Sequence, residues 1–119
     1  MFVDDETRLQ HMLQAAQQAQ TFVVGKQRGD LEADAILSYA LVHVISIIGE
    51  AAARITPETR LKLPNIPWQA MIAMRNRLIH AYFSIDLDLV WNTVSDDLPP
   101  LINELMSVVK PMPPAETEN

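Results

Sequence analysis

Apolar residues recur at every third or fourth position along most of the chain, which is the spacing of one face of an α-helix. The first such stretch carries apolar residues at Leu9, Met12, Leu13, Ala16, Ala19 and Val23. Gly25 is expected to end this helix. Asp30 is expected to cap a second helix that runs from Leu31 to about Ile55. The middle of that segment is apolar on nearly every face, so we expect it at the centre of a bundle or in a subunit interface.

Capping residues and prolines mark the next two elements. Thr56 is a natural N-cap, and Pro57 suits the first position of a short helical turn. A third long helix is expected to open at Trp68 and to run to about Tyr82. Its apolar face would consist of Trp68, Met71, Ile72, Leu78 and Ile79.

The sequence pattern in the last part of the chain predicts a further helix followed by a tail. Asp86 can cap the helix, and Pro99-Pro100 is expected to break the chain before a final apolar stretch. Residues 111–119 are rich in proline and acidic side chains and have no apolar period, so we expect a disordered tail after one domain of residues 1–110. The whole pattern predicts an all-α fold, an up-and-down bundle of four to five helices.

Composition narrows the class of protein. With 119 residues, 49% of them apolar and 20% charged, the chain has the size and composition of one folded domain. The absence of cysteine excludes disulfides, thiolate metal ligands and cysteine nucleophiles. The first residues lack the basic and apolar regions of a secretory signal, so a cytoplasmic protein is expected. The longest apolar stretch, residues 35–49, is shorter than the roughly 20 residues of a membrane span, so no membrane association is expected.

Charge is distributed unevenly along the chain. A net charge of −6 argues against broad, sequence-independent binding of nucleic acid. Residues 54–80, however, contain five of the nine Lys and Arg residues and one of the fifteen acidic residues. A basic centre in an acidic body suits a site that grips one or two phosphates, although these charges could equally be a solvated surface.

One segment combines the side chains needed to cut RNA without a metal ion. Residues 75–82, RNRLIHAY, place two arginines, an amide, an imidazole and a phenol in an otherwise apolar helix. Such cleavage requires a group that moves protons, a cation that stabilises extra phosphate charge, and a donor that orients them. A string of this kind also occurs by chance, and a histidine beside an arginine on a helix is more often part of a surface or interface hydrogen bond.

The spacing within this segment predicts the arrangement of its side chains on a straight helix. His80 would share a face with Asn76, and would also neighbour Arg77. Arg75 would lie about 140° around the axis from His80. Pairing of the two would need a long reach or a facing helix from a second copy, which predicts a homodimer with the site near its two-fold axis.

The same segment resembles the signature of HepT-like proteins of the HEPN superfamily, which is an arginine, four residues, a histidine, one residue and a tyrosine. The run that follows, YFSIDLDLVWNTVSDDLPPLI, and the upstream runs ISIIGEAAARIT and LPNIPWQAMIAMRNR also resemble that family. The resemblance covers roughly residues 5–110.

This resemblance implies a HEPN-like homodimeric bundle in which two signature helices form a composite ribonuclease cleft. It implies that Arg75 and His80 are catalytic and that Asn76 helps to hold the site. Arg77 is expected to bind substrate phosphate. The resemblance further implies a partner, a small MNT-type nucleotidyltransferase antitoxin that uses ATP to attach AMP to Tyr82.

Two functions remain open at this point. The first is the toxin of a type VII HEPN/MNT toxin-antitoxin system, a metal-independent endoribonuclease that cuts cellular RNA and leaves a 2′,3′-cyclic phosphate. AMP on Tyr82 would neutralise it. The alternative is a catalytically silent helical dimer that serves as the binding partner of a nucleotidyltransferase. The intact set of Arg75, Asn76, His80 and Tyr82 favours the ribonuclease.

Three other polar residues are weaker candidates. His11 is expected at the surface or in an interface, and His43 in the core or a dimer interface. Glu50 could reach the cationic cluster or form an interhelical salt bridge. The three histidines are too widely separated to form a local metal motif, and no Gly-rich phosphate loop is present, so neither a metal nor a nucleotide cofactor is predicted.

Overall fold

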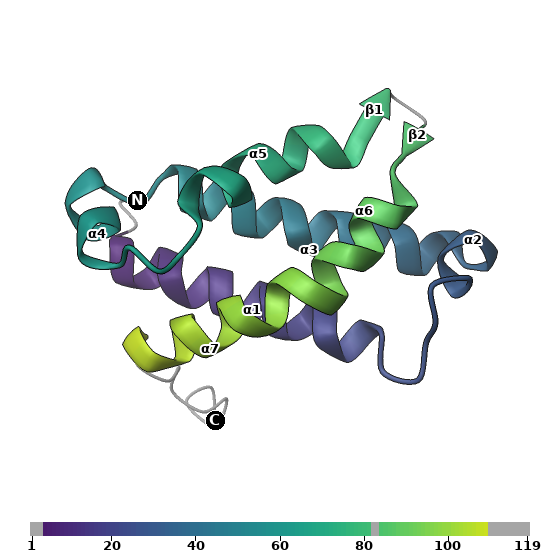
Figure 1. Cartoon of the computed structure of the whole chain (residues 1–119), viewed down its shortest axis with the longest axis horizontal. Coiled ribbons are helices and arrows are strands. Elements are labelled where there is room, and N and C mark those ends of the chain that lie inside the picture. Colours follow the sequence, from purple (N-terminus) through teal and green to yellow (C-terminus); the bar gives the residue numbers. More distant parts are fainter. Residues whose placement is uncertain (1–3, 82–83, 110–119) are drawn as a thin grey trace, which may run out of the picture.

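Helices form almost all of the structure, a computed structural model that describes residues 4–81 and 84–109 (Figure 1). The longer helices are α1 (Asp5–Phe22), α3 (Ala35–Ala53), α5 (Trp68–Leu78) and α7 (Leu98–Val108). Shorter segments are α2 (Asp30–Ala33), α4 (Pro57–Lys62), α6 (Leu87–Asn92) and the π-helical turn η1 (Thr93–Asp97). The strands β1 (Ile79–Ala81) and β2 (Ser84–Ile85) form a small antiparallel hairpin. The predicted all-α bundle is confirmed.

Helix α3 lies at the centre of this bundle. It packs against α1 on one side and α5 on the other, while α7 packs against α1. Figure 1 shows the green and yellow run from α6 to α7 crossing the bundle diagonally. Fully buried side chains from these helices meet in one core, and the largest include Met12, Leu41, Leu78, Val90 and Leu105. Of the two positions expected for the apolar second segment, the bundle centre is confirmed, and a subunit interface stays a prediction.

By length and composition, α3 is the one helix in the described part of the chain that could cross a membrane. Half of its most apolar window is nevertheless buried inside the bundle. Length and apolar composition alone are a weak indication, because the core helix of a globular domain passes the same test.

Local capping explains several helix starts. The Thr56 side chain accepts a hydrogen bond from the Thr59 N–H, and Pro57 occupies the first turn of α4. The Asp86 carboxylate accepts from the Leu89 N–H at 3.0 Å and so caps α6. Both predicted caps are confirmed. Gly25, at φ 74°, lies in the turn that follows α1 and adopts the left-handed conformation that favours glycine.

The prediction of one helix from Leu31 to about Ile55 is wrong, because the chain breaks at Asp34. The Asp34 side chain caps α3 by accepting from the Leu37 N–H at 3.1 Å. Asp30 does not cap a helix, since its carboxylate accepts from the Gln27 N–H at 2.7 Å in the preceding turn. Asp30 and Asp34 are both possible N-caps, and Asp34 is the one that caps the long helix.

The third long helix is also shorter than predicted, since it ends at Leu78 and not near Tyr82. The Asp86 N–H donates to the Leu78 carbonyl at 2.7 Å, so a backbone group at the helix end is satisfied from β2's side of the hairpin. Ile79 pairs with Ile85 in that hairpin, where β-branched side chains are favoured. Tyr82 lies outside the described residues.

The predicted break at Pro99-Pro100 is wrong as well. Both prolines lie in the first turn of α7, where backbone N–H groups have no partner within the helix and their loss costs little. The wide turn of η1 leads directly into α7, and the Leu98 N–H donates to the Thr93 carbonyl. The predicted tail, residues 111–119, lies outside the described residues.

Candidate active site

The C-terminal half of α5 carries three polar residues in a row, Arg75, Asn76 and Arg77, and all three are exposed. The helix is anchored in the core by Trp68, Met71, Met74 and Leu78, and Arg75 projects on the same side as Met71 and Leu78, next to α3. Cations near the last turn are also favoured by the negative end of the helix dipole. The sequence therefore fixes α5 by its apolar face and presents its basic end to the solvent.

The start of α5 is held by groups around Trp68. The Trp68 Nε1–H donates to the Leu63 carbonyl at 3.0 Å. The Arg60 guanidinium lies over the Trp68 ring, 6.0 Å from its centroid, and donates to the carbonyls of Ala52 and Ala53 at the end of α3. One of the five cations in the basic segment is thus structural, because it ties α4 and α5 to the C-terminus of α3.

Gly49 sets the distance between α3 and α5. A Cβ atom at this position would lie 2.8 Å from the Met71 carbonyl oxygen and 3.9 Å from the Arg75 Cβ. Any side chain would therefore push the two helices apart, so the close approach requires glycine. Sequence reasoning did not single out this residue, although a glycine in the middle of an apolar helix is the signal that would have found it.

Arg75 reaches across this contact to Glu50. The Arg75 Nη1 and the Glu50 Oε2 are 3.2 Å apart, and the side chains are 58% and 50% exposed. Glu50 therefore reaches the cationic cluster and does so through an interhelical salt bridge, so the two roles expected for it coincide. An exposed pair of this kind stabilises the fold by about 0–1 kcal/mol. Its larger consequence is its location, since it places the guanidinium beside the end of α3 on the surface.

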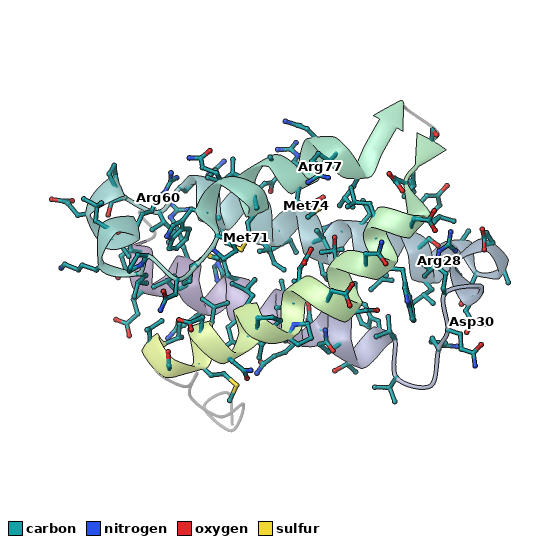
Figure 2. The ribbon with its side chains drawn as sticks, in the orientation of Figure 1. Arg28, Asp30, Arg60, Met71, Met74 and Arg77 are labelled. Carbon is teal, nitrogen blue, oxygen red and sulfur yellow. The ribbon has the colours of Figure 1, made fainter. Side chains whose placement is uncertain are left out.

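Arg77 lies on the other side of α5, about 200° around the helix from Arg75. It lines a cavity of about 450 Å³ between α3, α5, η1 and α7, together with Met71, Met74, Asp96 and Asp97. Figure 2 labels Arg77, Met71 and Met74 along α5. Burial and the neighbouring Asp96 raise the pKa of Asp97, while Arg77 lowers it. Arg75 and Arg77 therefore do not converge on one point within a single chain.

His80 lies on β1 and not on α5. The prediction that His80 continues the helix of Asn76 and Arg77 is therefore wrong, because that helix ends at Leu78. Because Arg75 and His80 do not share one straight helix, the angle between them is no longer an argument for a homodimer. The structure brings Arg75 and Asn76 to the end of α5 and places the His80 backbone immediately after it.

The remaining candidates lie on α1 and α3. His43 is exposed on α3, so the core position considered for it is wrong and the interface position is still a prediction. His11 is exposed on α1, as expected. It lines an open cleft of about 220 Å³ with Arg8, Ile47, Glu50, Ala51 and Arg54. Among the described residues, no three His, Cys, Asp or Glu side chains are grouped so as to hold a metal ion.

Comparison with known proteins identifies the family. The chain matches the family described as "Ribonuclease HepT-like" over residues 12–108. It is 43% identical over 70 residues to a Methanocaldococcus jannaschii protein named "Putative RNase", an alignment that covers 59% of this chain and 64% of that one. It is 40% identical over 72 residues to the "Probable ribonuclease HepT" of Thermococcus cleftensis, covering 60% and 66%. The chain thus spans just under two thirds of the length of these two relatives.

A third relative is covered almost completely. The chain is 31% identical over 102 residues to a Caldanaerobacter subterraneus protein that is also named "Putative RNase", covering 86% of this chain and 91% of the relative. No solved structure matches the chain significantly. Because the family match extends over most of the chain, the protein belongs to the HepT-like ribonuclease family of the HEPN superfamily.

Proposed function

We propose that the chain is a metal-independent endoribonuclease in which Arg75 and His80 act on the scissile phosphate and Asn76 helps to hold the site. The observation that carries this proposal is the position of Arg75, which is exposed near the basic end of α5 and paired with Glu50. The strand that bears His80 directly follows this helix. Membership of a ribonuclease family supports it.

The reaction proposed is an internal transfer at one RNA phosphate. The 2′-oxygen attacks the adjacent phosphorus, the bond to the 5′-oxygen of the next nucleotide breaks, and the products are a 2′,3′-cyclic phosphate and a 5′-hydroxyl. His80 moves the proton that leaves the 2′-hydroxyl or the proton that the 5′-oxygen gains. Arg75 stabilises the extra negative charge of the five-coordinate transition state.

Arg77 is the residue that we assign to a neighbouring substrate phosphate. It shares its cavity with the carboxylates of Asp96 and Asp97, so a phosphate at this position would have to compete with them. An arginine can form two parallel hydrogen bonds to a phosphate, which favours such an exchange. Its position on the far side of α5 separates this subsite from Arg75.

The active form proposed is a homodimer, and an exposed stripe on α3 supports it. Ile36 and Tyr39 are 81% and 64% exposed. His43 and Glu50 continue the same face of the helix, and both are exposed. Large apolar side chains in such a stripe mark an interaction surface. Because the stripe ends at the partner of Arg75, a second copy packed along α3 would lie beside the site.

The biological role proposed is that of a type VII toxin in the cytoplasm, neutralised by an MNT-type nucleotidyltransferase. The Tyr82 phenol oxygen would attack the α-phosphate of ATP, form a phosphodiester to AMP and release pyrophosphate. The position of Tyr82, two residues after His80, supports this assignment, since AMP there would bring negative charge to the site of the substrate phosphate. The alternative role is a silent dimer that only binds the nucleotidyltransferase.

The test of the ribonuclease proposal is cleavage of single-stranded RNA by the purified chain in the presence of EDTA. Cleavage with 2′,3′-cyclic phosphate and 5′-hydroxyl ends is expected. Loss of cleavage in EDTA, or products with 5′-phosphate ends, would exclude the metal-independent mechanism. Absence of any cleavage by unmodified protein of confirmed intact mass would favour the silent dimer.

A further inference from the structure

An open cleft lies between α1 and α3, next to Glu50, the partner of Arg75, and is not part of the catalytic set. It is lined by Arg8 and His11 from the start of α1 and by Ile47, Glu50, Ala51 and Arg54 from the end of α3. Arg8 and His11 are three residues apart, and Glu50 and Arg54 are four apart, so each pair lies on one face of its helix. The two helices pack against each other, which brings both pairs into the same cleft of about 220 Å³.

The cleft is cationic in a protein whose net charge is −6. Neither the Arg8 nor the Arg54 guanidinium makes a salt bridge to a residue that the structure describes. Asp5, the acidic residue one turn before Arg8, accepts hydrogen bonds from Thr56 and Thr59 and also attracts Arg8 electrostatically without forming a salt bridge to it. Two arginines that form no salt bridge within the described residues, beside a histidine, suit a phosphate, because guanidinium donors match its oxygens.

Glu50 connects this cleft to the candidate active site. Its carboxylate lines the cleft and also lies 3.2 Å from the Arg75 Nη1. Arg75 thus compensates the one negative charge that would otherwise repel an anion from the cleft. Cations therefore lie on both sides of Glu50, with Arg75 on α5 and Arg8 and Arg54 beyond it.

We propose that the cleft of Arg8, His11 and Arg54 binds a backbone phosphate of the RNA strand that is cut at Arg75. The strand then runs from the end of α5 over Glu50 to the groove between α1 and α3. This inference rests on the proposed ribonuclease function and adds to it a second, sequence-independent contact, which gives an acidic protein the local attraction for RNA that its total charge lacks.

The test measures binding of a fluorescein-labelled single-stranded RNA whose 2′-hydroxyls are methylated, so that it cannot be cleaved. Arg8→Gln and Arg54→Gln are each expected to weaken affinity roughly threefold, and the double variant roughly tenfold, from the usual worth of exposed charge pairs. The slope of log affinity against log salt should fall by about 0.7 for each phosphate of the single strand that the variant no longer neutralises. Arg54→Lys keeps the charge and should retain most of the affinity.

The matched control is Lys26→Gln, which removes the same charge from the exposed turn beyond the far end of α1. It should leave both affinity and salt slope unchanged. Wild-type affinity and slope in the Arg8→Gln, Arg54→Gln double variant would overturn the inference. So would a loss of binding that only follows a loss of the dimer in light scattering, because the cleft would then lie between two copies.

Two results separate this inference from the proposed function. If the wild-type chain neither binds nor cuts RNA, the ribonuclease function itself fails. If the wild-type chain cuts RNA and Arg75→Ala does not, while the double variant binds as tightly as the wild type, only the phosphate site is wrong. A double variant that binds RNA normally but no longer accepts AMP from a nucleotidyltransferase would also overturn it, since the cleft would then hold a partner protein.

Discussion

The Arg75 guanidinium lies 3.2 Å from the Glu50 carboxylate, across the narrow contact between α5 and α3 that Gly49 permits. Both side chains are about half exposed, so the pair adds little to folding stability. The location of this salt bridge is more informative about function than its contribution to stability. Glu50 pairs with the cation that we assign to the scissile phosphate, and it also lines the cleft that contains Arg8 and Arg54.

Glu50→Gln should separate binding of RNA from its cleavage. Removing the carboxylate takes a negative charge out of the proposed path of the strand, so affinity for uncleavable RNA should rise severalfold. Arg75 loses the partner that orients it, so the single-turnover cleavage rate at saturating enzyme should fall. Glu58→Gln removes the same charge from α4 and should change neither quantity. An unchanged cleavage rate in Glu50→Gln would show that Arg75 does not depend on the salt bridge for its orientation.

Gly49→Ala should destabilise the fold by roughly 1–3 kcal/mol, which is the usual cost of overpacking a tight contact. The new Cβ would lie 2.8 Å from the Met71 carbonyl oxygen, and a backbone atom cannot move aside as a flexible side chain can. Urea unfolding followed by circular dichroism measures the effect. Gly29→Ala is the control, because nothing lies within 4 Å of its Cβ and its φ of −65° suits alanine. Equal midpoints for the two variants would show that the two helices do not need glycine at position 49.

Arg75→Ala and His80→Ala should each lower RNA cleavage by about a hundredfold or more, because removing a group that stabilises the transition state typically costs that much. Arg75 is exposed, so its replacement should leave the unfolding transition within roughly 0.5 kcal/mol of the wild type. Cleavage rates under single-turnover conditions check both variants. Lys62→Ala, which removes an exposed cation from α4, should cut RNA normally. Wild-type cleavage by either site variant would remove that residue from the mechanism.

Asp97→Asn should stabilise the protein slightly at neutral pH. Burial and the nearby Asp96 raise the pKa of Asp97 above its ordinary value of 3.8, so the ionised carboxylate is less favourable in the folded chain than in the unfolded one. Protonated Asp97 therefore contributes its full share of stability below the unfolded pKa, and this contribution is lost as the pH rises through the higher folded pKa. Asp97→Asn should therefore raise the free energy of unfolding by roughly 0.5 kcal/mol or less at pH values above the folded pKa. This increase should vanish below pH 3.8, where Asp97 is protonated in both states. Urea unfolding across pH measures it, and a gain that persists at lower pH would contradict the assignment.

Helix starts that depend on residues close together in the sequence could be predicted. Thr56-Pro57 and Asp86 start helices as expected, because a capping side chain and the N–H that it binds are a few residues apart. Helix ends decided by distant partners could not be predicted. The end of α5 depends on the Asp86 N–H reaching the Leu78 carbonyl, and that hydrogen bond exists only once the hairpin has formed.

The same distinction applies to the candidate site. Exposure of Asn76 follows from the apolar face of α5, so a local pattern was sufficient. Arg75 shares the side of Met71 and Leu78, so its exposure did not follow from that pattern. The cleft could not be predicted, because Arg8 and Arg54 come from opposite ends of two antiparallel helices and meet only in the folded bundle. Glu50 was open to two interpretations until the approach of α5 at Gly49 placed Arg75 within its reach.

Tyr82→Phe should keep ribonuclease activity and lose its control by a nucleotidyltransferase. The substitution keeps the aromatic ring and removes the oxygen to which AMP would be attached. In the unmutated chain, AMP on Tyr82 would bring negative charge close to the position where Arg75 meets the substrate phosphate, so the modified protein should bind RNA poorly. Intact mass after co-expression with an MNT-type nucleotidyltransferase detects the modification, since each AMP adds about 329 Da.

The other tyrosine of the chain provides the control. Tyr39 is 64% exposed on α3, so its phenol is accessible to a modifying enzyme, yet it is remote in sequence from His80. Tyr39→Phe should still gain AMP and lose toxicity on co-expression, whereas Tyr82→Phe should remain toxic and unmodified. If Tyr82→Phe gained AMP as readily as the unmutated chain while Tyr39→Phe did not, the acceptor would lie on α3. Inhibition would then act through the proposed dimer face instead of the substrate phosphate.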